Sequence, residues 1–358
     1  MKAWVLHGVD DFRFEEHDKP VPKAGEVLVR VRAAGICGSD SPRVYQTGAH
    51  VHPLVLGHEF SGDVVEAEER LRDKWLGKRV GIFPLIPCGV CGPCRSRQYE
   101  MCRNYSYLGS RRDGGFTDYV AVTEANLIAL PENATYEQAA MLEPMSVAVH
   151  AMRRGFALLE GKTASELTVA VYGLGTIGLL LVMFLRQAGV RNILAIGNKE
   201  FQRKQLLALG IPEQQYCDGR QCDAQGWIMD KTDGTGAALS FECVGKNETI
   251  LQAVESTMPA GGIVLLGNPY SDIHFEKNVY WKILRNQLKV TGTWNSSFTH
   301  EDTDDWHYVL DCLKNGTVAP ERMISHRYSM EQLIDGFHIM RDKTEDYVKI
   351  MGINEAEL

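Results

Sequence analysis

The sequence predicts an α/β protein that combines a doubly wound parallel sheet with a second, β-rich unit. From residue 167 onward, short apolar runs typical of buried strands alternate with longer runs typical of helices. This alternation is the pattern of a parallel sheet with crossover helices. Residues 1–145 instead contain short strand-like runs punctuated by Gly and Pro. A chain of 358 residues is long enough for two hydrophobic cores.

The individual elements are predicted from the spacing of apolar residues. Residues 26–32 alternate valine with other residues and are predicted as a half-buried strand. A helix is predicted over 137–154, and Pro144 suits a first helical turn. The strands of the parallel sheet are expected at 167–172, 192–196, 239–243, 262–266 and 288–292. The other expected elements are helices at 177–188, 199–209, 246–258, 304–314 and 330–341, and a last strand at 347–352.

The composition is that of an ordinary globular protein, with 44% hydrophobic and 23% charged residues. The net charge of −8 argues against general binding to nucleic acid or to an anionic membrane. The N-terminus lacks the apolar region of a signal peptide. The uncharged stretch 167–185 contains three glycines, which favour a strand, a turn and a helix over a membrane span. We therefore expect a cytoplasmic protein with no membrane partner.

Four of the nine cysteines lie close together in the sequence: Cys88, Cys91, Cys94 and Cys102. Glycine and proline between them permit the tight bends that direct four sulfurs at one centre. Four thiolates form the closed tetrahedral shell of a structural zinc site, which we expect within residues 85–104. Such clustering favours a reducing cytosol over a disulfide framework. The cysteines expected to be thiols without a role are Cys217, Cys222, Cys243 and Cys312.

A glycine-rich turn follows the predicted strand 167–172 and opens the next helix. It has the spacing G-x-G-x-x-G, in which the glycines permit the turn, the approach of a pyrophosphate and close helix packing. The helix N-terminus then receives the phosphate charge. The pattern predicts a dinucleotide site. The residues expected to contact the cofactor at this turn and after later strands are Gly173, Gly175, Thr176, Ile177, Gly178, Val244 and Gly267.

The second strand of this unit ends without the acidic residue that binds the ribose 2′-hydroxyl in NAD-preferring domains. The residues expected to contact this part of the cofactor are Gly197, Asn198, Lys199 and Arg203. Without a carboxylate, a 2′-phosphate meets less repulsion, and a nearby cation attracts it. We therefore predict a preference for NADP(H). The alternative is that Lys199 and Arg203 form a solvated helix face and that NAD is used.

Three further segments carry side chains that bind metals: Cys37-Gly38-Ser39-Asp40, Gly57-His58-Glu59 and Leu142-Glu143-Pro144. None is decisive alone, because a buried Cys or His is usually part of a core and a Glu before Pro is often a helix cap. Their occurrence together with a four-cysteine site and a dinucleotide fingerprint is more specific. With this set of motifs, the sequence resembles the zinc-dependent medium-chain dehydrogenases over nearly its full length.

The resemblance implies the domain organisation of that family. A GroES-like catalytic domain is expected at residues 1–150 and a Rossmann domain at 151–290. Residues 291–358 are expected to return to the catalytic domain. The resemblance also implies a homodimer or homotetramer, and the strand near 288–294 is a plausible sheet edge for pairing.

The resemblance further implies a catalytic zinc bound by Cys37, His58 and an acidic third ligand. We expect Glu143 as that ligand, with Glu59 beside the metal as a supporting or exchanging group. Three protein ligands leave one position for water or substrate oxygen. Zinc lowers the pKa of an alcohol there, and the resemblance implies hydride transfer from its carbon to the nicotinamide.

Proton transfer from the alcohol is assigned to Ser39, which lies two residues after the first zinc ligand. Many relatives carry a His three residues further on that passes the proton onward. Pro42 occupies that position here. The proton must therefore leave by another route, through water or through the cofactor ribose.

Within the family, the chain most resembles the branch of galactitol-1-phosphate 5-dehydrogenases. The matching segments are 39–43, 48–50, 56–62, 108–116 and 292–295. This branch oxidises a secondary alcohol of a sugar-alcohol phosphate to a ketose phosphate, as from galactitol 1-phosphate to tagatose 6-phosphate. It carries Asp at position 197 and uses NAD, so the glycine there is a departure.

A phosphorylated substrate requires cations at some distance from the zinc. The residues expected to contact the substrate are Arg43, His50, Arg111, Arg112 and Trp294. The alternative is that Arg111 and Arg112 are a surface pair, or form ion pairs with Asp113 and Asp118.

Three rival functions fit parts of the sequence. A sorbitol-, butanediol- or threonine-type dehydrogenase would share the zinc and hydride chemistry but act on an unphosphorylated secondary alcohol. A zinc-ribbon module that binds nucleic acid would explain the arginines near the cysteines, but not the net charge or the second set of metal ligands. A zinc-free quinone reductase would share the fold but not need the cysteine cluster, Cys37 or His58.

Overall fold

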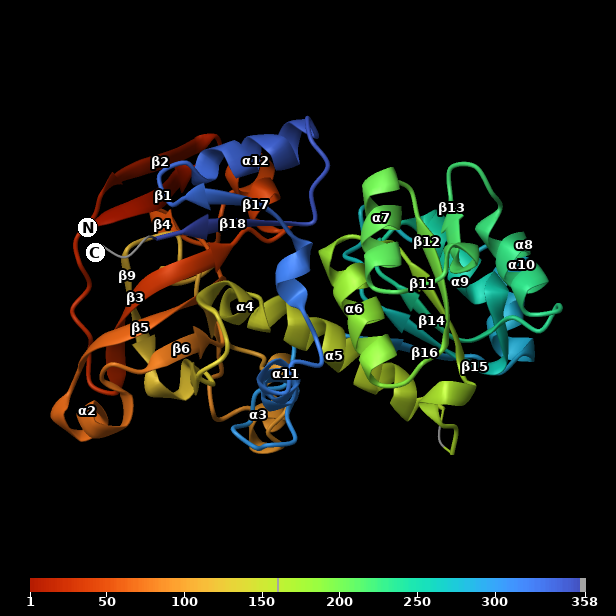
Figure 1. Ribbon diagram of the computed structural model, residues 1–358, viewed down its shortest axis with the longest axis horizontal. Helices are drawn as coiled ribbons and strands as arrows, with labels where there is room; N and C mark the ends of the chain where they lie inside the picture. Colours follow the sequence, from red (N-terminus) through yellow and green to blue (C-terminus); the bar gives the residue numbers. More distant parts are fainter. Residues whose placement is uncertain (160, 355–358) are drawn as a thin grey trace. The chain divides into compact units, whose positions relative to one another are not determined.

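The structure is a computed structural model that describes residues 1–159 and 161–354 (Figure 1). The chain forms two compact units, of which the first contains Met1–Pro144 and Ser297–Leu358 and the second contains Met145–Ser296. The division falls at Pro144 and Ser296, whereas the sequence suggested residues 150 and 290.

The first unit is built mainly from β-strands. Its largest sheet has the order β10 (Leu127–Ala129), β6 (Arg79–Ile82), β5 (Glu59–Ala67), β3 (Glu26–Gly35), β18 (Lys349–Ile353) and β17 (Ile324–Ser329), with β9 (Tyr119–Thr123) also paired to β3. Two smaller sheets contain β2 (Asp11–Glu16), β1 (Lys2–Gly8) and β4 (Leu54–Val55), and β7 (Leu85–Ile86) with β8 (Ser106–Tyr107). The predicted strand at 26–32 is confirmed as part of β3, whose valines enter the core of this unit.

Short helices connect these strands. They are α1 (Asp40–Pro42), η1 (Arg43–Thr47), α2 (Glu69–Trp75), α3 (Gly92–Arg95), η2 (Tyr99–Met101), η3 (Glu124–Asn126), α4 (Tyr136–Ala140), α11 (Asp305–Lys314), η6 (Pro320–Met323) and α12 (Leu333–Asp342). A longer helix, α5 (Leu142–Ala157), begins in the first unit, and its residues from Met145 onward belong to the second. The single helix predicted at 137–154 is therefore two helices. Thr135 and Gln138 cap the first of them reciprocally, and Pro144 lies in the first turn of the second.

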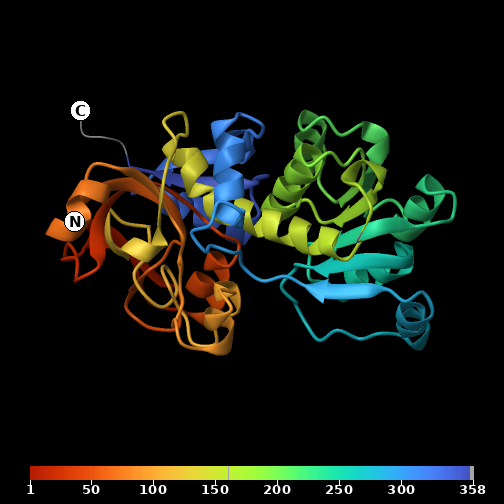
Figure 2. The same ribbon diagram turned by 90° about the horizontal axis from the view of Figure 1, so that it is seen from below.

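The second unit contains a parallel sheet of six strands, as the alternating pattern predicted. Its order is β13 (Tyr216–Asp218), β12 (Asn192–Gly197), β11 (Thr168–Tyr172), β14 (Ala237–Glu242), β15 (Thr257–Leu265) and β16 (Lys289–Gly292). The helices of this unit are η4 (Ala164–Glu166), α6 (Thr176–Gln187), α7 (Glu200–Ala208), η5 (Glu213–Gln215), α8 (Ala224–Lys231), α9 (Asn247–Ser256) and α10 (Lys277–Arg285). The light-blue arrow in Figure 2 is β16, which forms one edge of the sheet. The sequence patterns missed β13, α8 and α10.

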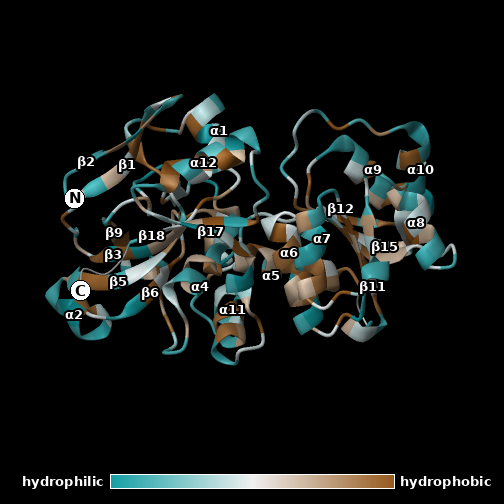
Figure 3. Ribbon diagram, turned by 45° about the horizontal axis from the view of Figure 1, so that its top comes forward, coloured by the Kyte–Doolittle hydropathy of each residue, from teal (hydrophilic) through white to brown (hydrophobic). Residues whose placement is uncertain are grey.

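The uncharged stretch 167–185 is a strand, a turn and a helix, as predicted. β11 and α6 both contribute fully buried side chains, whereas α7 is largely hydrophilic (Figure 3). No helix among the described residues is long and apolar enough to cross a bilayer.

One expectation about the cysteines is wrong. Cys217 and Cys222, expected as thiols, form a disulfide in the structure. The reason is local, because the chain turns back directly after β13. The N–H groups of Gln221 and Cys222 both donate to the Asp218 carbonyl oxygen, at 2.9 and 3.1 Å. Cys243 and Cys312 remain thiols.

Candidate active site

Cys37, His58 and Glu59 form one compact group in the first unit. Their ligand atoms all lie within 4.8 Å of one another. The pairing of β3 with β5 produces this group, because Glu59 lies opposite Gly35 and Cys37 follows two residues later. Gly35 must lack a side chain, since a Cβ there would lie 2.5 Å from Glu59 Oε2.

The chemistry of this group suits a zinc ion. Thiolate, imidazole and carboxylate are the three ligand types that zinc takes from proteins. His58 Nδ1 is buried and makes no hydrogen bond within the described residues. Burial alone would lower the pKa of His58, but the negative charges of Asp40 and Cys37 overcome this and raise the pKa well above 6.5. The group therefore favours positive charge at the place where a metal would supply it.

The carboxylate that completes this group is not the one that we predicted from the sequence. Glu59, and not Glu143, lies in the compact set. Glu143 is buried and accepts a hydrogen bond from Tyr107 Oη at 3.2 Å. Burial raises the pKa of Glu143 to about 7, and repulsion by Glu59 adds to this effect. The Glu143 side chain is thus placed beside the group, and its coordination of zinc stays a prediction.

A buried lysine that the sequence patterns did not identify balances the charge of Glu59. Lys349 Nζ lies 2.5 Å from Glu59 Oε2 and also donates to the Ile36 carbonyl oxygen at 3.1 Å. Burial alone would lower the pKa of Lys349, but the attraction of Glu59 and Cys37 overcomes this and raises the pKa. The only sequence feature that could have indicated this role is the position of Lys349 in the otherwise apolar strand predicted at 347–352.

Asp40 and Arg43 form a second layer of contacts around the metal group. Asp40 is fully buried, accepts the Cys37 N–H at 3.1 Å and lies 3.5 Å from His58 Nδ1. Arg43 Nη1 donates to Asp40 Oδ1 at 3.0 Å and to Ser39 Oγ at 2.9 Å. Ser39 Oγ donates in turn to Cys37 Sγ at 3.4 Å. Asp40 therefore orients the ligands, a role that the motif around Cys37 could have suggested.

His50, one of the expected phosphate-binding residues, lies within the electrostatic range of two others, Arg43 and Arg111. Burial lowers the pKa of the His50 imidazole, and the positive charges of Arg111 and Arg43 lower it further. Arg111 donates to the Tyr105 carbonyl oxygen at 2.9 Å and lies over the Tyr105 ring. We call Arg43, His50 and Arg111 the cation cluster. Its positive charge at neutral pH comes from the two arginines, because the lowered pKa leaves His50 uncharged and able to form hydrogen bonds only.

The other expected substrate residues are placed differently. Arg112 does not pair with Asp113 or Asp118 but forms an ion pair of 2.8 Å with the buried carboxylate of Glu26. That contact holds β3 and makes Arg112 a structural residue. Trp294 is 57% exposed and belongs to the second unit.

The four clustered cysteines surround one centre, as the sequence predicted. The sulfur of Cys91 lies 3.5 Å from that of Cys94 and 3.9 Å from that of Cys102. Cys88 Sγ lies 3.9 Å from Cys94 Sγ. Four thiolates around a tetrahedral zinc at about 2.3 Å would be about 3.8 Å apart, so the spacing fits zinc. Backbone N–H groups of Arg103 and Cys94 lower the pKa of the Cys91 thiol to about 6, which favours the thiolate.

The glycine-rich turn of the second unit leaves space where a phosphate would approach. A Cβ on Gly175, which caps α6, would meet nothing within 4 Å. Gly173 has φ +94°, and a Cβ there would lie 2.5 Å from Val244 Cγ2. A Cβ on Gly178 would lie 1.9 Å from the Gly173 carbonyl oxygen. The turn thus requires glycine at its first and third positions and is open at its second, which fits a dinucleotide.

The later strands end close to this turn. Glu242, at the end of β14, is fully buried and accepts the N–H of Val244 at 2.8 Å and the N–H of Gly245 at 2.9 Å. A Cβ on Gly267 would lie 2.0 Å from the Gly245 nitrogen. Val244 and Gly267 are therefore held by tight backbone packing at the carboxyl end of the sheet.

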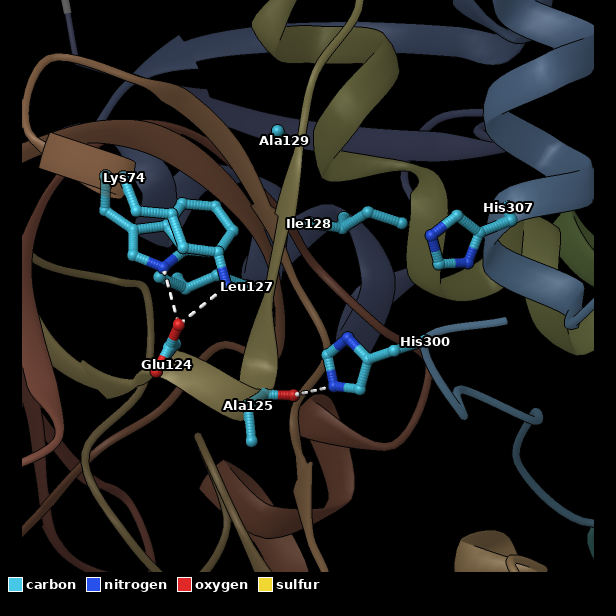
Figure 4. Close-up of a pocket in the computed structure, with 9 residues that line it drawn as sticks. Lys74, Glu124, Ala125, Leu127, Ile128, Ala129, His300 and His307 are labelled. Carbon is cyan, nitrogen blue, oxygen red and sulfur yellow. Dashed lines mark hydrogen bonds and ion pairs between the residues drawn. The ribbon is translucent and has the colours of Figure 1, made fainter. Parts of the chain in front are cut away.

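A hollow of about 450 Å³ lies elsewhere in the first unit (Figure 4). Lys74 and Trp75 both donate to Glu124 on one side, and His300 bonds to the Ala125 carbonyl oxygen on the other. It contains no residue that the sequence patterns selected. His307, which also lines it, bonds to Asp304 outside the hollow at 2.9 Å. Since these polar side chains all have partners, we assign the hollow to the packing of this unit.

Comparison with known proteins identifies the family. Residues 23–132 match the alcohol dehydrogenase GroES-like domain, and residues 176–315 match the zinc-binding dehydrogenase domain. The chain is 33% identical to galactitol 1-phosphate 5-dehydrogenase of Escherichia coli K12 over 306 residues, which cover 86% of each chain. The chain belongs to the zinc-dependent medium-chain dehydrogenase family. As a member of it, the protein is an NAD(P)-dependent oxidoreductase that acts on an alcohol.

Solved structures agree with this assignment. A crystal structure of galactitol-1-phosphate dehydrogenase from E. coli superimposes with a TM-score of 0.90 at 31% identity, covering 99% of this chain and 100% of that one. A structure from Sinorhizobium meliloti, described as a zinc-binding dehydrogenase bound to NADP, superimposes with a TM-score of 0.88 at 28% identity, covering 99% of each chain. In this medium-chain dehydrogenase, Cys37, His58 and a carboxylate are the groups that would hold the catalytic zinc.

Proposed function

We propose that this dehydrogenase oxidises a secondary alcohol of a sugar-alcohol phosphate to the ketose phosphate, with galactitol 1-phosphate as the model substrate. The observation that carries the proposal is the cation cluster of Arg43, His50 and Arg111. Arg43 links this cluster to the metal group, because it contacts Ser39 and Ser39 contacts Cys37. Guanidinium groups match phosphate oxygens well.

Each side chain of the site has a separate role in the proposed reaction. Zinc, when bound, would make the substrate hydroxyl more acidic. Ser39 accepts the hydroxyl proton while it releases its own, and the hydrogen bond from Arg43 Nη1 holds Ser39 Oγ in position. Asp40 orients His58, and Lys349 balances the charge of Glu59. Since Pro42 cannot carry a proton, we assign the next transfer to water.

The cofactor proposed for this chain is NADP(H). Gly197 ends β12 without a carboxylate that would repel a 2′-phosphate. The S. meliloti structure, which is bound to NADP, supports the choice as a relative of the same fold.

Replacing Arg111 by Gln tests the phosphate assignment. We expect KM for galactitol 1-phosphate to rise about 10- to 100-fold, because a hydrogen bond between charged groups is lost, while kcat/KM for galactitol itself changes little. Steady-state assays on both alcohols measure this. Arg112→Gln is the matched control and should leave the preference for phosphate unchanged. Equal activity of the unsubstituted enzyme on polyol and polyol phosphate would contradict the proposal.

A second candidate is a dehydrogenase of an unphosphorylated alcohol, of the sorbitol, butanediol or threonine type. One observation favours it, which is that Arg43 already pairs with Asp40 and Ser39. In that case Arg43 would serve only to hold the ligands in place, and the same panel of alcohols would select this function.

We also propose that two copies pair through the edge strand β16. Among the described residues β16 pairs with no strand other than β15. The Gly292 carbonyl oxygen accepts Arg154 Nε at 2.7 Å, so a partner strand would pair along the remainder of this edge. Val290 on this strand is 44% exposed, and Trp281 and Leu284 on α10 of the same unit are 44% and 56% exposed. A second copy related by a two-fold axis would cover such an edge.

Val290→Asp should halve the mass of the assembly, because like charges would face each other across the paired strands. Analytical ultracentrifugation measures this. Val51→Asp, which changes an equally exposed valine in the first unit, is the control and should leave the mass unchanged. An unchanged mass for Val290→Asp would exclude this pairing.

A further inference from the structure

The end of β12 has little room for any side chain at position 197. A Cβ on Gly197 would lie 3.0 Å from both Gln202 Oε1 and Leu174 Cδ1, and 3.1 Å from Tyr216 Cε2. Gln202 is held there because it accepts the Asn198 N–H at 3.1 Å. A side chain at position 197 would therefore have to displace these neighbours, and with glycine there a group on a neighbouring segment can take the 2′ position.

Arg203, which the sequence suggested for this role, is already neutralised. Its Nη1 lies 2.7 Å from Glu200, and its Nη2 pairs with Glu213. Two carboxylates thus hold both ends of the guanidinium on α7. Arg203 therefore carries no charge in excess for a phosphate, and its contact with the cofactor stays a prediction.

The turn after β13 places a different arginine beside Gly197. β12 and β13 run parallel with Gly197 opposite Asp218, and the Gly219 N–H donates to the Gly197 carbonyl oxygen at 2.9 Å. Arg220 follows directly. Its positive charge also acts on the phenol of Tyr216, whose ring contacts the Gly197 position.

Arg220 is oriented by a single carboxylate and stays accessible. Asp218 binds its Nε at 3.0 Å and its Nη2 at 2.6 Å, and also accepts the Arg220 backbone N–H at 3.0 Å. The side chain is 58% exposed. Asp218 is its only ion-pair partner among the described residues, so the other edge of the guanidinium can take an anion. The disulfide between Cys217 and Cys222 closes the same turn.

We propose that Arg220 binds the 2′-phosphate of NADP(H), and that Asp218 positions its guanidinium beside Gly197. The inference rests on the proposed preference for NADP(H) and identifies Arg220 as the residue responsible for that preference. In a doubly wound sheet the adenosine ribose lies at the end of the second strand, which is β12 here. A guanidinium fits a phosphate through two parallel N–H donors, which explains arginine rather than lysine at this position.

The test measures binding of two cofactor fragments to the full protein by isothermal titration calorimetry. The fragments are adenosine 2′,5′-bisphosphate and 5′-AMP, which differ only in the 2′-phosphate. For Arg220→Gln we expect the affinity for the bisphosphate to fall about 10- to 100-fold, because charge-assisted hydrogen bonds are lost. The affinity for 5′-AMP should change less than about twofold. For Arg220→Lys, the affinity for the bisphosphate should lie between that of the unaltered protein and that of Arg220→Gln.

Two further variants separate the alternatives. Arg203→Gln should leave both affinities unchanged, as should Arg191→Gln, which alters an exposed arginine just before β12. If the unaltered protein prefers the bisphosphate but Arg220→Gln binds it equally well, the role of Arg220 is excluded and the NADP preference stands. If the unaltered protein binds both fragments equally, the NADP preference itself is wrong, while the assignment as an alcohol dehydrogenase is unaffected.

Discussion

Replacing Cys37 by Ser should abolish turnover and remove one of two zinc ions per chain. The three groups that face the metal position come from β3 and β5, and loss of the thiolate leaves only His58 and a carboxylate. A metal that polarises the reacting oxygen contributes several kcal/mol to transition-state stabilisation. We therefore expect kcat/KM to fall at least about 10³-fold.

Zinc content by mass spectrometry and kcat/KM for a secondary alcohol measure the two effects. Cys91→Ser is the matched variant, because it changes a thiolate in the four-cysteine site. It should also lose one zinc, but its main effect should be on the thermal midpoint, since structural zinc contributes folding energy. Two retained zinc ions and normal turnover in Cys37→Ser would show that the assigned metal site is wrong.

The parts of this site that the sequence predicted are those encoded within short segments. The four cysteines fall within one lobe, and the three glycines of the G-x-G-x-x-G motif act within one turn. The spacing of residues within one segment defines the geometry of both sites, so the sequence motif is sufficient to predict them. The same holds for β3, where alternation of valine predicted the strand, although Glu26 and Leu28 before and between the valines are buried as well.

The parts that were missed depend on contacts between distant segments. Lys349 meets Glu59 only because β18 and β5 both pair with β3. Arg112, in the loop between β8 and β9, meets Glu26 at the start of β3, and no local pattern indicates that pair. Arg203 is a different case, because Glu200 lies three residues before it on the same helix face. That ion pair could have been predicted from spacing alone.

The stability of the first unit depends on the charged side chains that are buried next to the metal group. Asp40 and Glu59 are nearly inaccessible, and each is compensated by a cation. Asp40 pairs with Arg43, three residues further along the chain, and Glu59 pairs with Lys349 from β18. Removing the cation leaves a carboxylate buried without a partner, which costs more than the ion pair itself contributes. The site should therefore be sensitive to changes in residues that never touch the substrate.

Lys349→Met tests this dependence and should lower stability strongly. The ammonium group and the Glu59 carboxylate are 3% and 2% exposed, so solvent cannot replace the lost partner. We expect the free energy of unfolding to fall by about 3–5 kcal/mol, as for other broken buried pairs. Urea denaturation followed by tryptophan fluorescence measures it.

The double variant Lys349→Met with Glu59→Gln provides the control for that experiment. Neutral glutamine removes the unpaired charge, so most of the lost stability should return, although zinc affinity would stay reduced. Lys343→Met, which changes an exposed lysine at the end of α12, should have little effect because the solvent already screens its charge. If the double variant is no more stable than Lys349→Met, the loss comes from packing in β18, and Glu59 needs no buried partner.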